Sequence, residues 1–499
     1  MGAKPGTLSL YKAISAKYGD DNLQGKRQYV PIDVLKELVT TEGIYREFCR
    51  HPKHQAWGKG GSRRRLAERV VGSNARKLFV VLVLLDQCLD TDKLLNSGLT
   101  DRDLPLFKDG HGFRSEPDSG KRFSLPPKWS SQTVDQFLES QWRVLAPVFG
   151  SSGEHRTFHQ RRPMPFQKME ESHKGGSNSV VFHAQIHPAH QRFSMTGSHS
   201  HEIVLKEFLP RNKKDFEIER NNLAAIRGLG DNKHITQYLE TFSQEGRSYI
   251  IFPFAKGGDL ENFWDTKKSR PRNRRLALWC LEQMFGLARG LQVLHEFLGD
   301  DKNCRHGDLK PGNILHFLTD GGDGTLKIAD FGISRIHTET TFQRLGKATT
   351  TRSTTPSYEA PEESLRQARS RKYDIWSMGC IFLEFTLWFA DSWDAVESFN
   401  NARTSKRARQ GENKPWARFY KGIGASAKVH PEVFQTLAKL RRLPRSATGT
   451  ALGDLLDTVE RHLLKVDVEA RFSSKELSER LEKIVSRAVT DAKYLFGSG

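Results

Sequence analysis

The chain has 499 residues, of which 37% are hydrophobic and 27% charged, so it is long enough for two or three compact domains. This composition excludes a collagenous, low-complexity or wholly disordered chain. Lysine and arginine number 78 against 59 aspartate and glutamate residues, and the net charge of +19 leaves nucleic acid, an acidic membrane surface and an acidic substrate open as partners.

Residues 1–160 are predicted to form a mainly helical domain. Pro31 can open a helix, because proline fits the first helical turn. A second helical stretch runs from about residue 65 to residue 95 with a break near Gly72 and Ser73, and residues 134–145 carry apolar side chains at the spacing of an amphipathic helix. Residues 109–130 are rich in glycine, proline, serine and charge and are predicted to be a loop.

From about residue 160 the chain changes to short apolar runs that are typical of strands. These runs cover residues 166–169, 180–186, 203–208, 235–243 and 248–254, and a charged helix begins near residue 213. After Gly257 and Gly258 the chain is predicted to be mainly helical to its end. A strand-rich small lobe followed by a helical large lobe is an α+β arrangement.

Two features of the predicted small lobe could hold phosphate groups. The turn at residues 174–181, KGGSNSVV, offers backbone N–H groups that glycines allow close to phosphate oxygens, although a plain hairpin explains it as well. Lys206 lies inside an apolar strand, where a charge is costly to bury unless it is paired, and Glu219 follows on the next helix. A Lys–Glu pair could hold the ammonium group against phosphates, and the alternative is a surface lysine with a solvated glutamate.

The segment at residues 305–315, RHGDLKPGNIL, places a carboxylate, an ammonium group and an amide in one short loop before an apolar strand. Asp308 can accept a hydroxyl proton, Lys310 can neutralise a transferring phosphoryl group, and Asn313 can hold a metal ion. Asp330 follows the apolar run LKIA and offers a second carboxylate for a metal. Two hard oxygen ligands with nucleotide phosphates suit Mg²⁺.

At this spacing, HGDLKPGNIL and IADFG resemble the catalytic loop and the metal-binding motif of the eukaryotic protein kinase family. The sequence APE at residues 360–362 resembles the end of that family's activation segment, and YDIWSMG at residues 373–379 resembles its buried large-lobe helix. Arg471 resembles the arginine that pairs with the glutamate of APE, here Glu362.

The resemblance implies a bilobal α+β kinase fold, with an antiparallel small-lobe sheet and a helical large lobe, after a helical N-terminal domain of unknown role. The implied limits are residues 1–160 for the N-terminal domain, 161–252 for the small lobe, 253–258 for the hinge, 259–488 for the large lobe and 489–499 for a C-terminal tail.

The resemblance also implies roles for the catalytic residues. Asp308 would orient and deprotonate the substrate hydroxyl, with Lys310 beside the γ-phosphate. Asn313 and Asp330 would bind Mg²⁺. Lys310, together with Thr355, resembles the serine/threonine-specific branch of the family rather than the tyrosine-specific one.

ATP is the implied cofactor beside Mg²⁺. Lys206 would contact its α- and β-phosphates and pair with Glu219, Phe252 would be the gatekeeper, and Asp259 would contact the ribose. The residues implied to surround ATP come from the glycine-rich turn, two strands, the hinge and the start of the large lobe: Lys174, Gly176, Ser179, Val181, Val204, Lys206, Phe252, Phe254, Ala255, Asp259 and Leu315.

The nucleotide pocket departs from the family pattern at two places. Lys174, Gly176 and Ser179 occupy the three glycine positions of the glycine loop, so only the central glycine is kept. We expect a stiffer loop, with slower turnover or altered nucleotide affinity. Val204 replaces the usual alanine above adenine and should narrow the pocket.

Gly307 replaces the arginine with which the family reads a phosphorylated activation loop, and Arg305, shifted by two positions, is not assigned that role. Our hypothesis is that activity does not depend on activation-loop phosphorylation through the usual arginine. The threonines at 349–351, 354 and 355 are then either autophosphorylation sites or part of a threonine-rich loop.

The favoured function is an active serine/threonine protein kinase that uses Mg-ATP on a protein substrate. A pseudokinase or scaffold is the alternative because of the eroded glycine loop, and a small-molecule kinase is less favoured because of APE and Arg471.

Other properties of the chain are less specific. Basic clusters at residues 63–65, 161–162 and 403–409 favour a solvated basic face over a nuclear-import patch, and no motif makes a strong case for nucleic acid. The five cysteines never form a CxxC pair, the N-terminal residues lack the apolar core of a secretory signal, and the longest apolar run, residues 78–85, is far shorter than a membrane span. We expect an intracellular protein with no membrane segment, in the cytoplasm and with the nucleus open; no oligomeric state is indicated.

Overall fold

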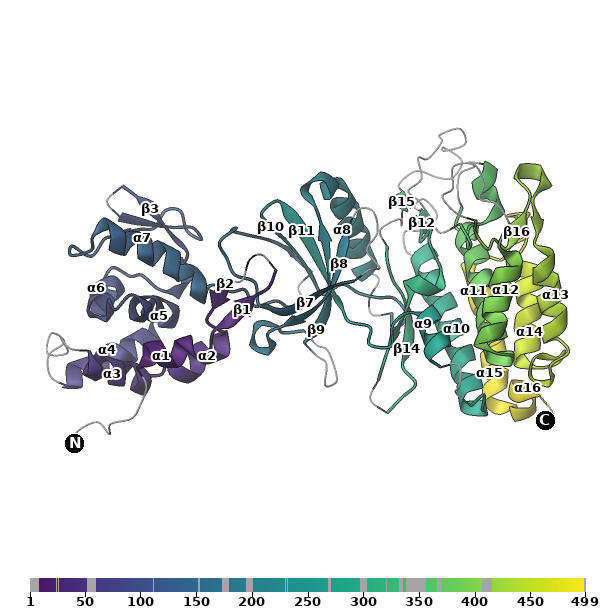
Figure 1. Ribbon diagram of the computed structural model, residues 1–499, viewed down its shortest axis with the longest axis horizontal. Helices are drawn as coiled ribbons and strands as arrows, with labels where there is room; N and C mark the ends of the chain where they lie inside the picture. The colour runs from purple at the N-terminus through teal and green to yellow at the C-terminus, as the bar shows by residue number, and fades with distance from the viewer. Residues whose placement is uncertain are drawn as a thin grey trace. The chain divides into compact units, whose positions relative to one another are not determined.

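The computed structural model divides the chain into two compact units. Unit one comprises Met1–Lys213 and Leu239–Pro253, and unit two comprises Lys214–Tyr238 and Phe254–Gly499. The residues that the structure describes are 9–23, 25, 27–51, 60–110, 112–150, 153–172, 179–193, 201–228, 230, 232–267, 271–296, 303–319, 321–331, 335–337, 356–365, 370–405 and 415–497. The helices and strands of both units are labelled in Figure 1, and each unit is described by itself.

The first part of unit one is mainly helical, as predicted. Its helices are α1 (Leu10–Ser15), α2 (Ile32–Leu38), α3 (Thr41–Arg50), α4 (Gly60–Gly72), α5 (Arg76–Leu84), α6 (Thr91–Asn96) and α7 (Ser131–Ser140). The predicted break near Gly72 is confirmed by the end of α4, and Pro31 directly precedes α2.

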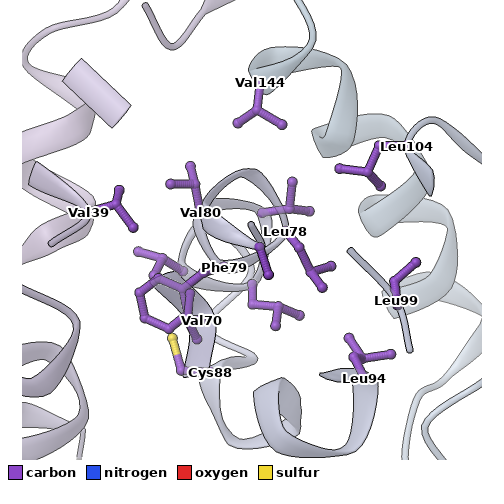
Figure 2. Close-up of a cluster of buried hydrophobic side chains, with 14 of the residues drawn as sticks. Val39, Val70, Leu78, Phe79, Val80, Cys88, Leu94, Leu99, Leu104 and Val144 are labelled. Carbon is purple, nitrogen blue, oxygen red and sulfur yellow. The ribbon is translucent and has the colours of Figure 1, made fainter. Parts of the chain in front are cut away.

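Helix α5 forms the centre of the N-terminal core. Its sequence, RKLFVVLVL, is apolar from Leu78 onward, and a helix that is apolar on all sides must be surrounded by other elements. Figure 2 shows Leu78, Phe79 and Val80 enclosed by apolar side chains that include Val39 and Leu104. The N-terminal part of unit one therefore has a hydrophobic core of its own.

The expectation of a loop over residues 109–130 is wrong where strands occupy about a third of that segment. A three-stranded antiparallel sheet runs through it in the order β3 (Leu106–Asp109), β4 (Gly112–Ser115) and β5 (Arg122–Ser124). Phe113 is paired with Phe123, and both side chains are buried, whereas their neighbours along the strands are mostly polar. In β4 and β5 a single apolar residue per strand packs into the core, and such isolated residues give no strand pattern in the sequence. A separate hairpin joins β1 (Gly19–Asp21) and β2 (Arg27–Tyr29).

The second part of unit one is a six-stranded sheet. Its strands are β6 (His155–Phe158), β7 (Phe166–Ser172), β8 (Val180–Ile186), β9 (Glu202–Phe208), β10 (Glu240–Gln244) and β11 (Arg247–Pro253), in the order β6-β10-β11-β9-β8-β7. All neighbours are antiparallel except β6 and β10. The strand predicted at 235–243 begins only at Glu240, because Ile235 instead pairs with Ile328 of unit two through an isolated bridge.

Strand β6 has no counterpart in the prediction, although it belongs to the sheet. Phe158 of β6 and Phe149 before it pack on one face of the sheet with Phe166 and Phe242. The predicted limit after residue 160 lies C-terminal to β6, so it assigns one strand of the six-stranded sheet to the N-terminal domain.

Unit two is helical apart from short strand pairs. Its helices are α8 (Lys213–Arg227, all but its first residue), α9 (Leu260–Thr266), α10 (Arg274–Glu296), α11 (Lys372–Ala390), α12 (Trp393–Arg403), α13 (Pro431–Leu440), α14 (Ala451–Thr458), α15 (Ser474–Thr490) and α16 (Ala492–Phe496). The antiparallel pairs are β12 (Asn303–Arg305) with β15 (Arg335–His337), β13 (Ile314–Phe317) with β14 (Thr325–Ile328), and β16 (Tyr420–Lys421) with β17 (Lys428–Val429).

Helix α11 lies at the centre of unit two, and every residue from Tyr373 to Ala390 is buried. The predicted limit at 488 falls inside α15, and Tyr494 of α16 is buried and donates a hydrogen bond of 2.6 Å to Asp454. The last described helix is thus part of the folded lobe. None of the helices in the described ranges has the length and apolarity needed to cross a membrane.

Candidate active site

The loop after β12 brings together two predicted catalytic side chains, Asp308 and Lys310, and one predicted metal ligand, Asn313. Lys310 Nζ donates to Asp308 Oδ2 at 2.8 Å, and Asn313 Nδ2 donates to the carbonyl oxygen of Asp308 at 2.8 Å and to its Oδ2 at 3.2 Å. Asp308 is 8% exposed, so its carboxylate is held in a largely dry position by two donors. The predicted cluster of a carboxylate, an ammonium group and an amide is confirmed as a cluster.

Asp374 of α11 fixes the backbone of this loop by accepting hydrogen bonds from it. Its two carboxylate oxygens accept the backbone N–H groups of His306 and Gly307, each at 2.8 Å, and its Oδ2 also bonds His295 Nε2 at 2.9 Å. Burial raises the pKa of Asp374, but the hydrogen bond and the charge of His295 oppose this effect and outweigh it. The pKa of Asp374 therefore lies below its usual value. The buried carboxylate is therefore ionised and serves as an anchor for the loop that carries Asp308.

The anchoring role of Asp374 was missed in the sequence. The available signal was an aspartate inside the otherwise apolar segment that becomes α11, because a buried charge must be matched by donors. Which donors match it depends on the fold, since His295 and His306 come from segments distant in the chain.

Gly307 adopts a left-handed backbone conformation with φ of +85°. A Cβ atom at this position would lie 3.3 Å from Nε of Arg305, whose guanidinium group lies 5.6 Å from the ring centroid of Tyr373. Glycine thus suits both the backbone angle and the space at the position where the resembled family has arginine.

The predicted metal ligands lie side by side at the open end of the β13–β14 hairpin. Asn313 directly precedes β13, and Asp330 follows β14; the carbonyl of Asn313 accepts the N–H of Ala329 at 2.9 Å. The amide nitrogen of Asn313 is directed to Asp308, so its amide oxygen is the atom left to face a cation. Asp330 is exposed and has a positive φ of 64°, a strained backbone that occurs at functional sites. The donor set, an amide oxygen and a carboxylate, fits Mg²⁺.

Helix α8 is joined to the segment of Asp330 by a hydrogen bond from Asn222. Asn222 Nδ2 donates to the carbonyl oxygen of Phe331 at 3.2 Å, and the Phe331 ring packs edge-on to His306. Glu219, one turn earlier on α8, is 2% exposed. Its predicted partner Lys206 belongs to unit one, and the pairing of Glu219 with Lys206 stays a prediction.

The predicted nucleotide-binding residues of unit one share one face of the sheet. Val181 of β8 is paired with Lys206 of β9, and Val204 of β9 is paired with Phe252 of β11. Directly paired residues, and residues two apart on one strand, point to the same side of a sheet. The opposite face carries Leu205 and packs into the phenylalanine-rich core. The four predicted residues therefore lie on the face of the sheet opposite to the phenylalanine-rich core.

The glycine-rich turn lies mostly outside the described residues. Lys174 and Gly176 belong to that gap, and Ser179 directly precedes β8.

The end of the predicted hinge and the residue after it are attached to β13 within unit two. Gly257 N–H donates to the His316 carbonyl at 3.0 Å, and His316 N–H donates to the Gly258 carbonyl at 2.8 Å. Asp259 forms an isolated bridge with Leu315, and its Oδ1 accepts the N–H of Asn262 at 2.8 Å as the cap of α9.

Of the other hinge residues, Ala255 is buried and Phe254 is half-buried. Their contacts with a nucleotide, like those of Asp259 and Leu315, stay predictions.

A buried ionic network that the sequence did not reveal lies behind the APE segment. Glu384 of α11 accepts hydrogen bonds from Tyr358 at 2.9 Å and from Arg403 at 3.0 Å, and the guanidinium of Arg403 lies 3.6 Å from the ring centroid of Phe419. Burial raises the pKa of Glu384 to about 7, although Arg403 and Tyr358 oppose the shift. This network fixes Tyr358, four residues before Glu362, to the central helix.

Comparison with known proteins gives one family. A family model described as "Protein kinase domain" matches residues 193–480. The chain is 32% identical over 188 residues to "Serine/threonine-protein kinase ATG1b" of Arabidopsis thaliana, covering 37% of this chain and 24% of that protein. It is 31% identical over 173 residues to human "Serine/threonine-protein kinase ULK3", covering 35% and 33%. It is 27% identical over 231 residues to "Calcium/calmodulin-dependent protein kinase cmkA" of Emericella nidulans, covering 46% and 50%.

The matched segments thus span a quarter to a half of these relatives' own lengths. The family model, in contrast, covers more than half of this chain and includes Asp308, Asn313, Asp330, Glu362 and Arg471. The chain belongs to the protein kinase domain family.

Proposed function

We propose that this protein is a serine/threonine protein kinase that transfers the γ-phosphoryl group of Mg-ATP to hydroxyl groups of protein substrates. The observation that carries the proposal is the arrangement of Asp308, Lys310 and Asn313 in one loop, anchored through its backbone to Asp374. The names of the relatives support the serine/threonine class.

In this proposal Asp308 positions the substrate hydroxyl and accepts its proton. The hydroxyl oxygen then forms its bond to the γ-phosphorus as the bond to the bridging oxygen breaks, and ADP leaves. Lys310, held 2.8 Å from Asp308, adds positive charge next to the oxygens that gain negative charge. When bound, Mg²⁺ neutralises charge on the phosphates, and Asn313 and Asp330 would hold it.

The sheet of unit one supplies the proposed nucleotide side of the site. Val181, Val204 and Phe252 offer apolar surface to the adenine, and Lys206, on the same face, offers an ammonium group to the phosphates. Glu219, which is 2% exposed on α8, is the residue that the family resemblance assigns to pair with that ammonium group, and this pairing is part of the proposal.

The alternative is a scaffold that has the fold of a kinase but little catalysis. It is motivated by the glycine loop, in which Lys174 and Ser179 replace two glycines. The two functions differ in the dependence of Mg-ATP turnover on Asp308.

The test uses the full chain with Mg-ATP and a mixture of generic protein substrates, and it measures phosphate incorporation and ADP release. Asp308→Asn should lower the rate by about 10² to 10⁴-fold, the size of a general-base contribution. Asp135→Asn, on the exposed side of α7, removes a carboxylate far from this loop in sequence and should leave the rate unchanged. A wild-type rate equal to that of Asp308→Asn would favour the scaffold.

Activity in this proposal does not depend on a phosphorylated activation loop read through residue 307, because Gly307 has no side chain to bind a phosphate. Replacement of the threonines at 349–351 by alanine should leave the rate within about twofold of wild type, since a missing arginine removes the charge-assisted contact. Loss of activity in a folded triple-alanine variant would contradict this part of the proposal.

A further inference from the structure

A cavity of about 200 Å³ lies within unit one, where the N-terminal helical part meets the six-stranded sheet. Its apolar wall comes from Val30, directly after β2, from α2 and from the segment at 144–148. Its polar wall consists of Lys77 of α5, Arg156 of β6, and Arg162 and His190 from the sheet side. No carboxylate lies among the described residues that line this cavity, which we call the junction cavity.

His190 contributes no charge to the junction cavity. Its Nε2 accepts the backbone N–H of Ile32 at 3.0 Å, so Nδ1 carries the proton and donates to the Pro147 carbonyl at 2.9 Å. Burial lowers the pKa of His190 to about 4. The imidazole is neutral and joins the two parts of unit one.

Arg156 is already matched by a carboxylate outside the wall. Its guanidinium forms an ion pair with the buried Glu240, and it also donates to the Val148 carbonyl at 3.1 Å. Glu240 in turn accepts the N–H of Gly150 at 2.7 Å. Arg156 is therefore a fixed part of the wall.

Lys77 and Arg162 are the two cations of the cavity wall that form no ion pair with a carboxylate among the described residues. In the same part of the chain, Arg162 Nε is a buried donor without a hydrogen-bond partner. Asp101 lies near Lys77, but its two oxygens accept the backbone N–H groups of Lys77 and Leu78 at 3.0 and 2.9 Å. Burial lowers the pKa of Lys77 and so does the charge of Arg162, against the effect of Asp101. Arg162 likewise has the carboxylate of Glu116 near enough to favour its charged form, but forms no ion pair with it. An anion in the cavity would supply the direct partner that these two cations lack among the described residues of its wall.

We propose that the junction cavity binds a phosphate group, held by Lys77 and Arg162 and backed by Arg156. Guanidinium and ammonium groups are the usual protein ligands of phosphate. The cavity is smaller than the about 300 Å³ at which ordinary small-molecule pockets begin, so it fits inorganic phosphate or the phosphate end of a small phosphomonoester. The site is independent of the proposed kinase activity, and its ligand would join the N-terminal helices to the sheet.

The test is titration calorimetry of the full chain with inorganic phosphate and, in parallel, glycerol phosphate, without nucleotide and at low salt. We expect binding with one site per chain, and a thermal midpoint that rises in phosphate compared with chloride at equal ionic strength. Binding of inorganic phosphate alone assigns the site to the free ion, and comparable binding of glycerol phosphate assigns it to phosphomonoesters.

Lys77→Met and Arg162→Met should each weaken phosphate binding by about tenfold or more, because each removes a charge-assisted contact. The matched controls, Lys36→Met on the exposed side of α2 and Arg161→Met at an exposed residue, should bind phosphate as wild type does. Without phosphate, Lys77→Met should unfold at the same temperature as wild type or higher, since it removes the cost of burying an ammonium group.

Lys206→Met separates this site from the proposed nucleotide site and should leave phosphate binding unchanged. The proposal is overturned if no heat of binding is found, if Lys77→Met and Arg162→Met bind phosphate as tightly as wild type, or if Lys206→Met abolishes the binding.

Discussion

Arg471 donates two parallel hydrogen bonds to Glu362, at 2.8 Å to Oε1 and 2.7 Å to Oε2. Both residues are buried, and Arg471 also donates to the carbonyl of Lys465 at 2.7 Å and lies 5.2 Å from the ring centroid of Trp376. The pair predicted from the APE motif is thus confirmed. It fixes the end of the segment that follows the metal-binding motif to the helical lobe.

Removal of one partner of this pair should be strongly destabilising. Arg471→Met leaves the carboxylate of Glu362 buried without its donors, and such a loss costs about 3–5 kcal/mol in the free energy of unfolding. Urea unfolding of the full chain, followed by tryptophan fluorescence, measures the change. The double variant Glu362→Met/Arg471→Met should recover part of the loss, because no charge is then left buried.

The exposed pair Lys17–Glu37 gives the matched control. Its N–O distance is 2.6 Å, but the side chains are 44% and 60% exposed, so Lys17→Met should cost less than about 1 kcal/mol. Equal losses for Lys17→Met and Arg471→Met would show that burial does not set the strength of the Arg471 pair.

Two glycines of α10 should respond in opposite ways to alanine. A Cβ atom at Gly286 would lie 2.1 Å from Nε2 of His234, whereas a Cβ atom at Gly290 has its nearest neighbours at ordinary contact distances of 3.5 Å. Gly286→Ala should lower the free energy of unfolding by about 1–3 kcal/mol, the usual cost of overpacking. Gly290→Ala should be neutral or stabilising, because alanine is the better helix former.

The same unfolding measurement distinguishes these outcomes. A second variant, His234→Ala, tests the cause: in that background Gly286→Ala should lose most of its cost, since the ring that it meets is gone. An unchanged cost would assign the effect to another neighbour of Gly286.

Features whose residues are neighbours in the chain could be predicted from the sequence. Asp308, Lys310 and Asn313 lie within one short loop, so their spacing alone implied the cluster that the fold produces. The strand at 180–186 and the helix break at Gly72 were also predictable, because their signals are local.

Contacts whose partners come from distant segments of the chain could not be predicted from the sequence. Asp374 is visible in the sequence only as a charge in apolar surroundings. Arg403 was expected on a solvated basic face with its cluster at 403–409, and this expectation is wrong for Arg403, which is buried and donates to Glu384. The partners of both residues are fixed by helix packing.

The junction cavity is lined by Lys77, Arg162 and the 144–148 segment, which are distant in the sequence, and no local sequence pattern indicates that they lie together. Strand β4 was missed because Phe113 is the one core residue among polar neighbours.

The buried His234 should make stability depend on pH in the weakly acidic range. Burial lowers the pKa of His234 to about 4, although its hydrogen bond to the Leu326 carbonyl opposes the shift. The unfolded chain, with a usual histidine pKa of about 6.5, binds more protons between these values, so stability rises with pH through this range and is lost as pH falls from about 6.5 to 4. A shift of this size corresponds to about 3 kcal/mol.

His234→Asn keeps a donor for the Leu326 carbonyl but does not titrate. Free energies of unfolding in urea, measured from pH 4 to pH 7 for both proteins, should therefore differ most at the acidic end, with the variant less sensitive to pH. Glu384, whose pKa is raised to about 7, contributes with the opposite sign in both proteins and cancels in the comparison. Parallel curves would contradict the assignment to His234.

The left-handed backbone at Gly307 should make this position intolerant of ordinary side chains, including the arginine that the resembled family carries there. Gly307→Ala should lower the free energy of unfolding by about 1–2 kcal/mol, because an alanine at φ of +85° is strained.

Gly98 has the same kind of backbone, with φ of +83°, but a Cβ atom there meets nothing within 4 Å. Gly98→Ala therefore reports the strain alone, and any extra loss in Gly307→Ala reports the 3.3 Å approach to Arg305. Gly307→Asn should be milder than Gly307→Ala, since asparagine tolerates the left-handed region. Equal unfolding free energies for Gly307→Ala and wild type would show that the loop relaxes freely, which the two hydrogen bonds of Asp374 to its backbone argue against.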